Sequence, residues 1–122
     1  MKTILLCDSG LGGLDIAARL IEQIRSMGDG AFRLIYFNAW PHPQCGYNQL
    51  KNDQERSQVF TAAFEGVARF HPDFCLIACN TLSIVYRKIA AVKPSSFPVI
   101  EMVRPASEFF AETMRCRPEL RL

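Results

Sequence analysis

The residues best suited to chemistry are a cysteine and the two polar residues that follow it, Cys79, Asn80 and Thr81. Cys79 ends a wholly apolar segment and precedes a stretch of helical character, so we expect it at a helix N-terminus, where a thiolate is stabilised. Asn80 and Thr81 are both helix-capping residues, and both can hydrogen-bond a ligand. A thiolate placed there can attack an electrophile or abstract a proton. The structural alternative is a buried core cysteine followed by a capping asparagine.

A second segment, residues 8–13 (DSGLGG), is a glycine-rich turn that opens a helix. Its glycines allow close approach of the backbone, and the free N–H groups of the helix favour an anion such as a carboxylate or phosphate. It lacks the Lys-Ser/Thr of a P-loop and the G-x-G-x-x-G of dinucleotide-binding folds. The structural alternative is a tight strand-to-helix turn in which Asp8 or Ser9 is the cap.

Apolar segments alternate along the chain with segments of helical period, which is typical of α/β folds. The expected elements are strands over 3–7, 32–37, 74–78 and 98–103, and helices over 12–27, about 53–70, about 80–91 and from Pro105 onward. Residues 28–30 end the first helix, and Pro118 bars the last helix from the tail. Every crossover is long enough to hold a helix. The sequence therefore predicts a three-layer α/β lobe over residues 1–104, with a short parallel sheet of about four strands. A terminal helix and a basic tail follow over residues 105–122.

The topology of such a sheet brings the chemically interesting segments together. Ligands of open parallel sheets bind beyond the carboxyl ends of the strands. Residues 8–13 follow the first expected strand, residues 38–48 follow the second, and residues 79–81 follow the third. We therefore expect all three segments along one edge of the sheet.

Composition narrows the class of protein. The chain has 122 residues, of which 49% are hydrophobic and 21% charged, so it has enough apolar surface to fold. Its formal net charge of +2 is too small to indicate binding to nucleic acid or to an anionic membrane. No apolar run approaches the ~20 residues of a membrane span. The first apolar stretch is cut short by Asp8, so we expect no signal peptide and a cytoplasmic location.

The five cysteines do not form a recognisable framework. An odd number in a chain without a targeting signal indicates reduced thiols, and Cys75, inside an apolar strand, is best interpreted as core filler. Cys7, Cys45, Cys79 and His42 could meet at one edge of the sheet as zinc ligands. Their spacing matches no known ligand pattern, so we expect no metal site.

Taken together, these segments resemble the aspartate/glutamate racemase superfamily over nearly the whole chain. Residues 8–14 match the opening Asp-Ser-Gly-x-Gly-Gly-Leu of that family. Residues 78–81 match its Ala-Cys-Asn-Thr at the end of the third strand, and residues 98–100 match its Pro-Val-Ile at the fourth. The motifs occur in the family's order and on the expected elements.

The resemblance implies a function and a role for each residue. Family members racemise acidic amino acids without a cofactor, using two cysteines on opposite faces of the α-carbon. The resemblance implies that Cys79 is one of these acid/base thiols, assisted by Asp8. It places Asp8 and Ser9 near the substrate amino group and the thiol, and it assigns Asn80 and Thr81 to the substrate carboxylate.

The sequence departs from the family in two places. Where glutamate racemases usually carry Pro-Tyr-Gly, this chain has residues 44–46 (QCG) followed by Tyr47. The resemblance still assigns Gly46 to substrate binding but leaves the particular acidic substrate open. The family's second catalytic cysteine lies in a Cys-Thr-His motif of a second lobe, and no such motif occurs here. We therefore expect a first lobe that pairs with a second lobe or with another copy, through an exposed final helix carrying Phe109 and Phe110.

Two alternative functions remain open. The chain could be another enzyme of the superfamily, of the hydantoin racemase or arylmalonate decarboxylase type. It could instead be a non-catalytic lobe that binds an anion and acts by association. In each case the expected ligand is a small acidic amino acid or a related carboxylate, with no cofactor, nucleic acid or membrane involved.

Overall fold

A four-stranded parallel sheet organises the chain. The computed structural model describes residues 1–28, 30–40, 42–117 and 119. The strands are β1 (Lys2–Asp8), β2 (Phe32–Asn38), β3 (Phe74–Ile77) and β4 (Val99–Glu101). Their order across the sheet is β2-β1-β3-β4, and every neighbouring pair is parallel. The expected α/β class with a short parallel sheet is confirmed.

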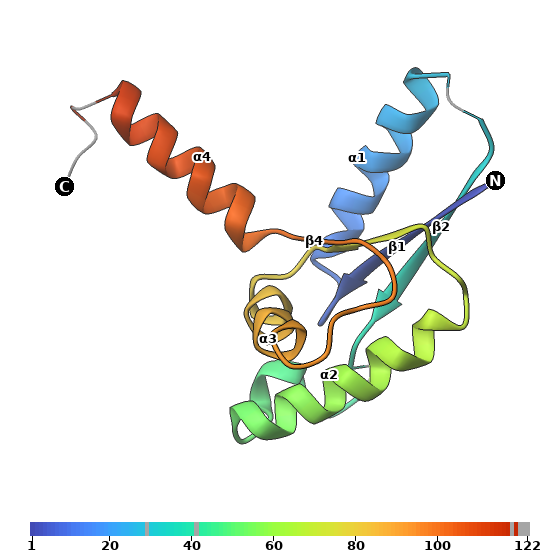
Figure 1. The fold of residues 1–122 in the computed structure, drawn as a ribbon, viewed down its shortest axis with the longest axis vertical. Coiled ribbons are helices and arrows are strands. Elements are labelled where there is room, and N and C mark those ends of the chain that lie inside the picture. The colour runs from blue at the N-terminus through green and yellow to red at the C-terminus, as the bar shows by residue number, and fades with distance from the viewer. Residues whose placement is uncertain (29, 41, 118, 120–122) are drawn as a thin grey trace.

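Helices cover both faces of the sheet. They are α1 (Gly13–Ser26), α2 (Asp53–Ala68), α3 (Asn80–Ala90) and α4 (Val103–Cys116), with a short 3₁₀ turn, η1 (Tyr47–Gln49), between β2 and α2. Helix α1 packs on one face, whereas α2 and α3 pack side by side on the other (Figure 1). This arrangement gives the three expected layers.

Strand β1 is the centre of the core. Leu5 and Cys7 point into the larger apolar cluster under α2 and α3, where they meet Phe60 and Leu82. Leu6 points to the opposite face, where the smaller cluster includes Ala17 of α1. A strand covered on both faces must be apolar at successive positions, which explains the continuous apolar run in this segment.

Most boundaries agree with the expected ones to within one residue, whereas the junction between β4 and α4 and the end of α2 each shift by two residues, for clear reasons. Helix α4 begins at Val103, before Pro105, because a proline in the first turn lacks only an N–H that has no partner within the helix. The Glu101 carboxylate accepts hydrogen bonds from the N–H groups of Val103 (2.7 Å) and Arg104 (3.2 Å), so it ends β4 and caps α4. Helix α2 ends at Ala68, because His71 adopts a left-handed φ of 49° and its N–H donates to the Ala68 carbonyl.

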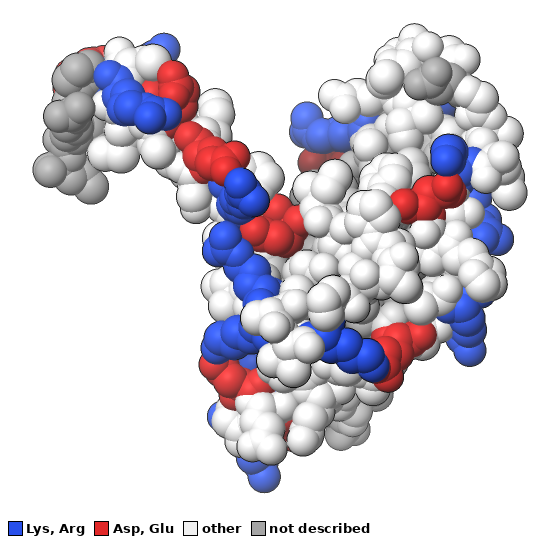
Figure 2. Space-filling model, in the orientation of Figure 1, with Lys and Arg blue, Asp and Glu red and all other residues white. Residues whose placement is uncertain are grey.

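Helix α4 projects away from the rest of the lobe (Figure 1) and buries none of its residues. Phe109 and Phe110 are 67% and 64% exposed, and their rings lie edge to face with centroids 6.0 Å apart. On the face drawn in Figure 2, both positive and negative side chains lie along this helix. Within the described residues, no helix is both long and apolar enough to cross a bilayer.

Some residues on which the sequence predictions rest lie outside the described part of the chain. They are Asp29 in the turn after the first helix, Pro41 in the loop after β2, Pro118 at the expected helix break and Arg121 in the tail.

The core makes a direct prediction about stability. Phe60 is 0% exposed within the larger cluster, so Phe60→Ala should lower the free energy of unfolding by about 3–5 kcal/mol. The matched change Phe110→Ala, on exposed α4, should alter it by less than about 0.5 kcal/mol. Urea unfolding followed by circular dichroism measures both, and equal midpoints for the two variants would contradict this packing.

Candidate active site

The strand order creates a topological switch point at the carboxyl edge of the sheet. Strand β1 lies between β2, which follows it in the chain, and β3, so the order of connection reverses beside β1. Ligands of doubly wound sheets bind at such a switch point. Cys7 and Ile77 are register partners, and the Ala78 N–H donates to the Cys7 carbonyl at 2.9 Å. Residues 8–13 and 79–81 therefore leave adjacent strands side by side.

Asp8 organises the glycine-rich turn. Its side chain is buried, with the residue only 5% exposed. One carboxylate oxygen accepts a hydrogen bond from the Ser9 N–H at 2.7 Å, and the other accepts one from the Gly13 N–H at 2.6 Å. The carboxylate thus caps the first turn of α1 and fixes the backbone of Ser9, which combines the structural role expected for a capping residue with a place in the site.

Two polar side chains of β2 complete this network. The Tyr36 hydroxyl lies 3.0 Å from the second Asp8 oxygen and 2.8 Å from the Gly10 carbonyl, to which the Asn38 amide also donates at 3.2 Å. Burial, and then the hydrogen bond to Asp8, raise the pKa of Tyr36 to about 12. In the sequence alone, Tyr36 has only the character of a good strand former. Its position on the face that packs against α1, two residues before the end of β2, was the available signal.

The two chemically interesting segments touch through a serine and a cysteine. Ser9 Oγ and Cys79 Sγ are 3.2 Å apart, within hydrogen-bonding distance, and either atom can donate. Cys79 is half-buried and occupies the N-cap position of α3, as its place in the sequence predicts. The contact holds the sulfur and the hydroxyl together at the start of α3.

Asn80 and Thr81 are the first two residues of α3. Asn80 is exposed and Thr81 is half-buried. The first N–H groups of a helix have no partner within it, and the helix dipole favours negative charge there. The turn around Cys79 therefore presents backbone donors, an amide and a hydroxyl beside the thiol.

Gly46 stands apart from this arrangement. It is exposed, and its N–H donates to the Gln49 side chain at 2.6 Å in the turn that begins η1. Tyr47, the next residue, is buried in the core cluster against which Cys79 packs, and its hydroxyl donates to the Arg56 carbonyl at 2.6 Å. The structure thus brings the loop after β2 to the core beneath the site, but it records no hydrogen bond from Gly46 to Ser9 or Cys79.

The remaining cysteines differ from Cys79 in their surroundings. Cys7 and Cys75 are both 0% exposed, in agreement with the core interpretation of Cys75. Burial raises the pKa of Cys75 to about 12, and burial followed by repulsion from Cys75 and Cys79 raises the pKa of Cys7 even further. Cys45 is half-buried in the loop after β2, and Cys116 is exposed at the end of α4. Over the described part of the chain, no three His, Cys, Asp or Glu side chains are placed to share a metal ion.

Comparisons of this chain with models of protein families, with curated proteins and with solved structures found no match.

The glycine-rich turn leaves too little space for a side chain at Gly13, which can be tested by substitution. A Cβ at this position would lie 3.2 Å from the Asp8 carboxylate, 3.2 Å from Leu6 and 3.3 Å from Ala78, so Gly13→Ala must displace part of the network. We expect it to cost about 1–3 kcal/mol of unfolding free energy. Gly10→Ala, whose Cβ would meet nothing within 4 Å, should be neutral or stabilise by up to about 1 kcal/mol. Chemical denaturation of both variants tests this, and a Gly13→Ala variant as stable as Gly10→Ala would contradict the packing around Asp8.

Proposed function

We propose that the chain is one lobe of a cofactor-independent amino-acid racemase of the aspartate/glutamate type, in which Cys79 transfers a proton at the α-carbon. The observation that supports this most is the 3.2 Å contact between Ser9 Oγ and Cys79 Sγ at the switch point of the sheet. A thiol, a hydroxyl and a helix N-terminus meet there at the edge where α/β folds bind ligands. The ligand class that fits is a small acidic amino acid or a related carboxylate.

The chemistry follows from these groups. The Cys79 thiolate removes the α-proton: an S–H bond forms, the Cα–H bond breaks, and the electron pair stays on the α-carbon and spreads into the adjacent carboxylate. Negative charge therefore grows on the carboxylate oxygens. Asn80 and Thr81 begin α3, where backbone N–H groups have no partner within the helix, so in this proposal these N–H groups stabilise the growing charge. The step transfers a proton only and needs no redox partner.

Asp8 has a positioning role in this proposal. The resemblance assigns it to assist the thiol, but both of its oxygens already accept hydrogen bonds from the turn and from Tyr36. Its effect on Cys79 therefore passes through Ser9, whose backbone it holds. Ser9 supplies the hydroxyl that reaches the sulfur.

Inversion requires a second acid on the opposite face of the α-carbon. Cys7 and Cys75 are buried in the core, and the sequence contains no Cys-Thr-His. We therefore propose that the second thiol comes from another lobe or another copy of the chain. The exposed rings of Phe109 and Phe110 on α4 offer an apolar surface against which such a partner can pack.

A prediction that tests the proposed function concerns the reactivity of the thiols. Iodoacetamide near neutral pH should alkylate Cys79 much faster than Cys75, because Cys79 is half-buried beside a hydrogen-bond donor and Cys75 is buried with a raised pKa. Ser9→Ala should slow the alkylation of Cys79 and leave that of exposed Cys116 unchanged. Peptide mass spectrometry gives each rate separately. Equal rates for Cys79 and Cys75 in the folded chain would remove the main support for a catalytic thiol.

A further prediction separates proton transfer from inversion. Each enantiomer of aspartate and glutamate is incubated with the chain in D₂O. We expect slow loss of the α-hydrogen by proton NMR, abolished by Cys79→Ala, and no inversion by polarimetry. The thiol that takes the α-proton exchanges it with the D₂O and, being fixed in place, delivers a deuteron to the same face of the α-carbon.

Three results would contradict this proposal, each in a different way. Rapid inversion that disappears in Cys79→Ala would show a complete racemase in this chain. Inversion that survives Cys79→Ala would exclude the thiol as the acid/base group. Binding of the amino acid without any exchange would favour the non-catalytic anion-binding alternative.

A further inference from the structure

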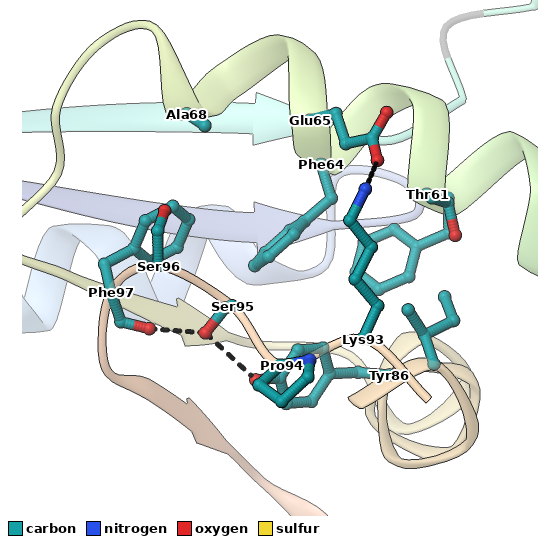
Figure 3. A pocket seen from close by; sticks show the side chains of 12 residues that line it. Thr61, Phe64, Glu65, Ala68, Tyr86, Lys93, Pro94, Ser95, Ser96 and Phe97 are labelled. Atoms are coloured by element: carbon teal, nitrogen blue, oxygen red, sulfur yellow. Dashed lines mark hydrogen bonds and ion pairs between the residues drawn. The ribbon is translucent and has the colours of Figure 1, made fainter. Parts of the chain in front are cut away.

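A cavity of about 170 Å³ lies between α2, α3 and the segment that joins α3 to β4. Its walls come from the second half of α2, the second half of α3 and residues 93–97 (Figure 3). Both helices start at the carboxyl edge of the sheet and run back toward its amino edge. The cavity therefore lies away from the candidate active site, and it shares no lining residue with that site.

Aromatic rings form most of the cavity wall. Phe64 is at the centre, with ring centroids 5.5 Å from Phe60, 5.7 Å from Tyr86 and 5.3 Å from Phe97. The three interplanar angles are 52°, 51° and 44°, so the rings present both edges and faces. Such tilted surroundings suit another planar aromatic ring, which can meet one neighbour by its face and another by its edge.

The charges at the mouth are already balanced. Lys93 and Glu65 form an ion pair across the opening, and both side chains are more than half exposed (Figure 3). A ligand anion would have to displace Glu65 from Lys93, and a ligand cation would have to displace Lys93 from Glu65. A neutral ligand leaves the pair intact.

The cavity lining has four hydroxyl groups, of which two are already hydrogen-bonded to each other or to the backbone. The Tyr86 hydroxyl donates to Ser95 Oγ at 3.4 Å, and Ser95 in turn donates to the Phe97 carbonyl. Thr61 and Ser96 also line the cavity, and their hydroxyls have no hydrogen-bond partner in the described part of the chain. They lie on different walls and at opposite ends of the lining (Figure 3), so a single polar substituent on a bound ring can use one of them at a time.

We propose that this cavity is a binding site for a neutral planar aromatic molecule of one or two fused rings with a single hydrogen-bonding group, of the phenol or indole class. The volume agrees with this size, since engineered apolar cavities of roughly 150 Å³ bind benzene. The aromatic wall selects a flat ring, the balanced ion pair selects a neutral molecule, and a free hydroxyl, that of Thr61 or that of Ser96, can pair with one polar substituent. This site does not depend on the proposed racemase function.

Titration of the ¹⁵N-labelled full chain with indole, followed by NMR, tests the proposal. We expect saturable shifts confined to residues 60–68 and 86–97. Ala68→Leu, which fills the cavity, should weaken binding at least about tenfold. The matched change Ala18→Leu, at an exposed position of α1 on the other face of the sheet, should have no effect.

A second variant keeps the test decisive if Ala68→Leu disturbs folding. The double change Thr61→Val and Ser96→Ala preserves the shape of the cavity and removes both free hydroxyls. It should weaken indole about fivefold while leaving benzene unchanged, because benzene makes no hydrogen bond.

Four outcomes would overturn the proposal. The first is that indole does not bind saturably, and the second is that it binds folded Ala68→Leu and folded Ala18→Leu with equal affinity. The third is that cyclohexanol binds as tightly as phenol, and the fourth is that indole-3-acetate binds more tightly than indole. The first two would remove the site. The third would remove its preference for aromatic rings, and the fourth its preference for neutral molecules.

Discussion

The buried carboxylate of Asp8 is the constraint on which the site depends. A charge withdrawn from water is costly unless hydrogen-bond donors replace the lost hydration. Here the Ser9 N–H, the Gly13 N–H and the Tyr36 hydroxyl supply those donors, and they come from the turn, from α1 and from β2. Satisfying one carboxylate therefore ties three elements together at the end of β1. The backbone of Ser9 is fixed as a consequence, and its hydroxyl is delivered to Cys79.

The alternating pattern of the sequence was sufficient to predict the class of fold, because strands buried on both faces must be continuous apolar runs. The ends of individual elements depend on local hydrogen bonds that this pattern does not reveal. Pro105 looks like the start of a helix, but the Glu101 carboxylate lets α4 begin at Val103. The order of the strands was not predictable, since periodicity describes how one segment is buried and says nothing about which strand pairs with it. The adjacency of β1 and β3 comes from tertiary packing.

The same limit applies to the two sites. Residue types and the expected sheet edge were sufficient to place Ser9 and Cys79 near one another, whereas their direct contact depends on the pairing of β1 with β3. Tyr36 was missed because a tyrosine in a strand is usually explained by packing. Phe60 is buried in the core cluster and Phe64 packs against it, but the cavity beside them was not predictable. A void depends on how imperfectly α2, α3 and residues 93–97 fit together, and no sequence period records that fit.

In the proposed mechanism, the fixed position of Cys79 and the need for a second thiol have the same physical cause. A carbanion formed at the α-carbon is planar and can accept a proton on either face, so the stereochemical result depends on where the acid stands. The network around Asp8 holds Ser9, and Ser9 holds Cys79 on one side of any ligand bound at the start of α3. A thiol free to swing across both faces would lose its contact with the Ser9 hydroxyl. In the proposed mechanism, the contact that positions Cys79 as a base therefore also keeps it from serving the opposite face. In this proposal, the fixed position of the first thiol is the physical reason why a second thiol must be supplied by a separate lobe or copy.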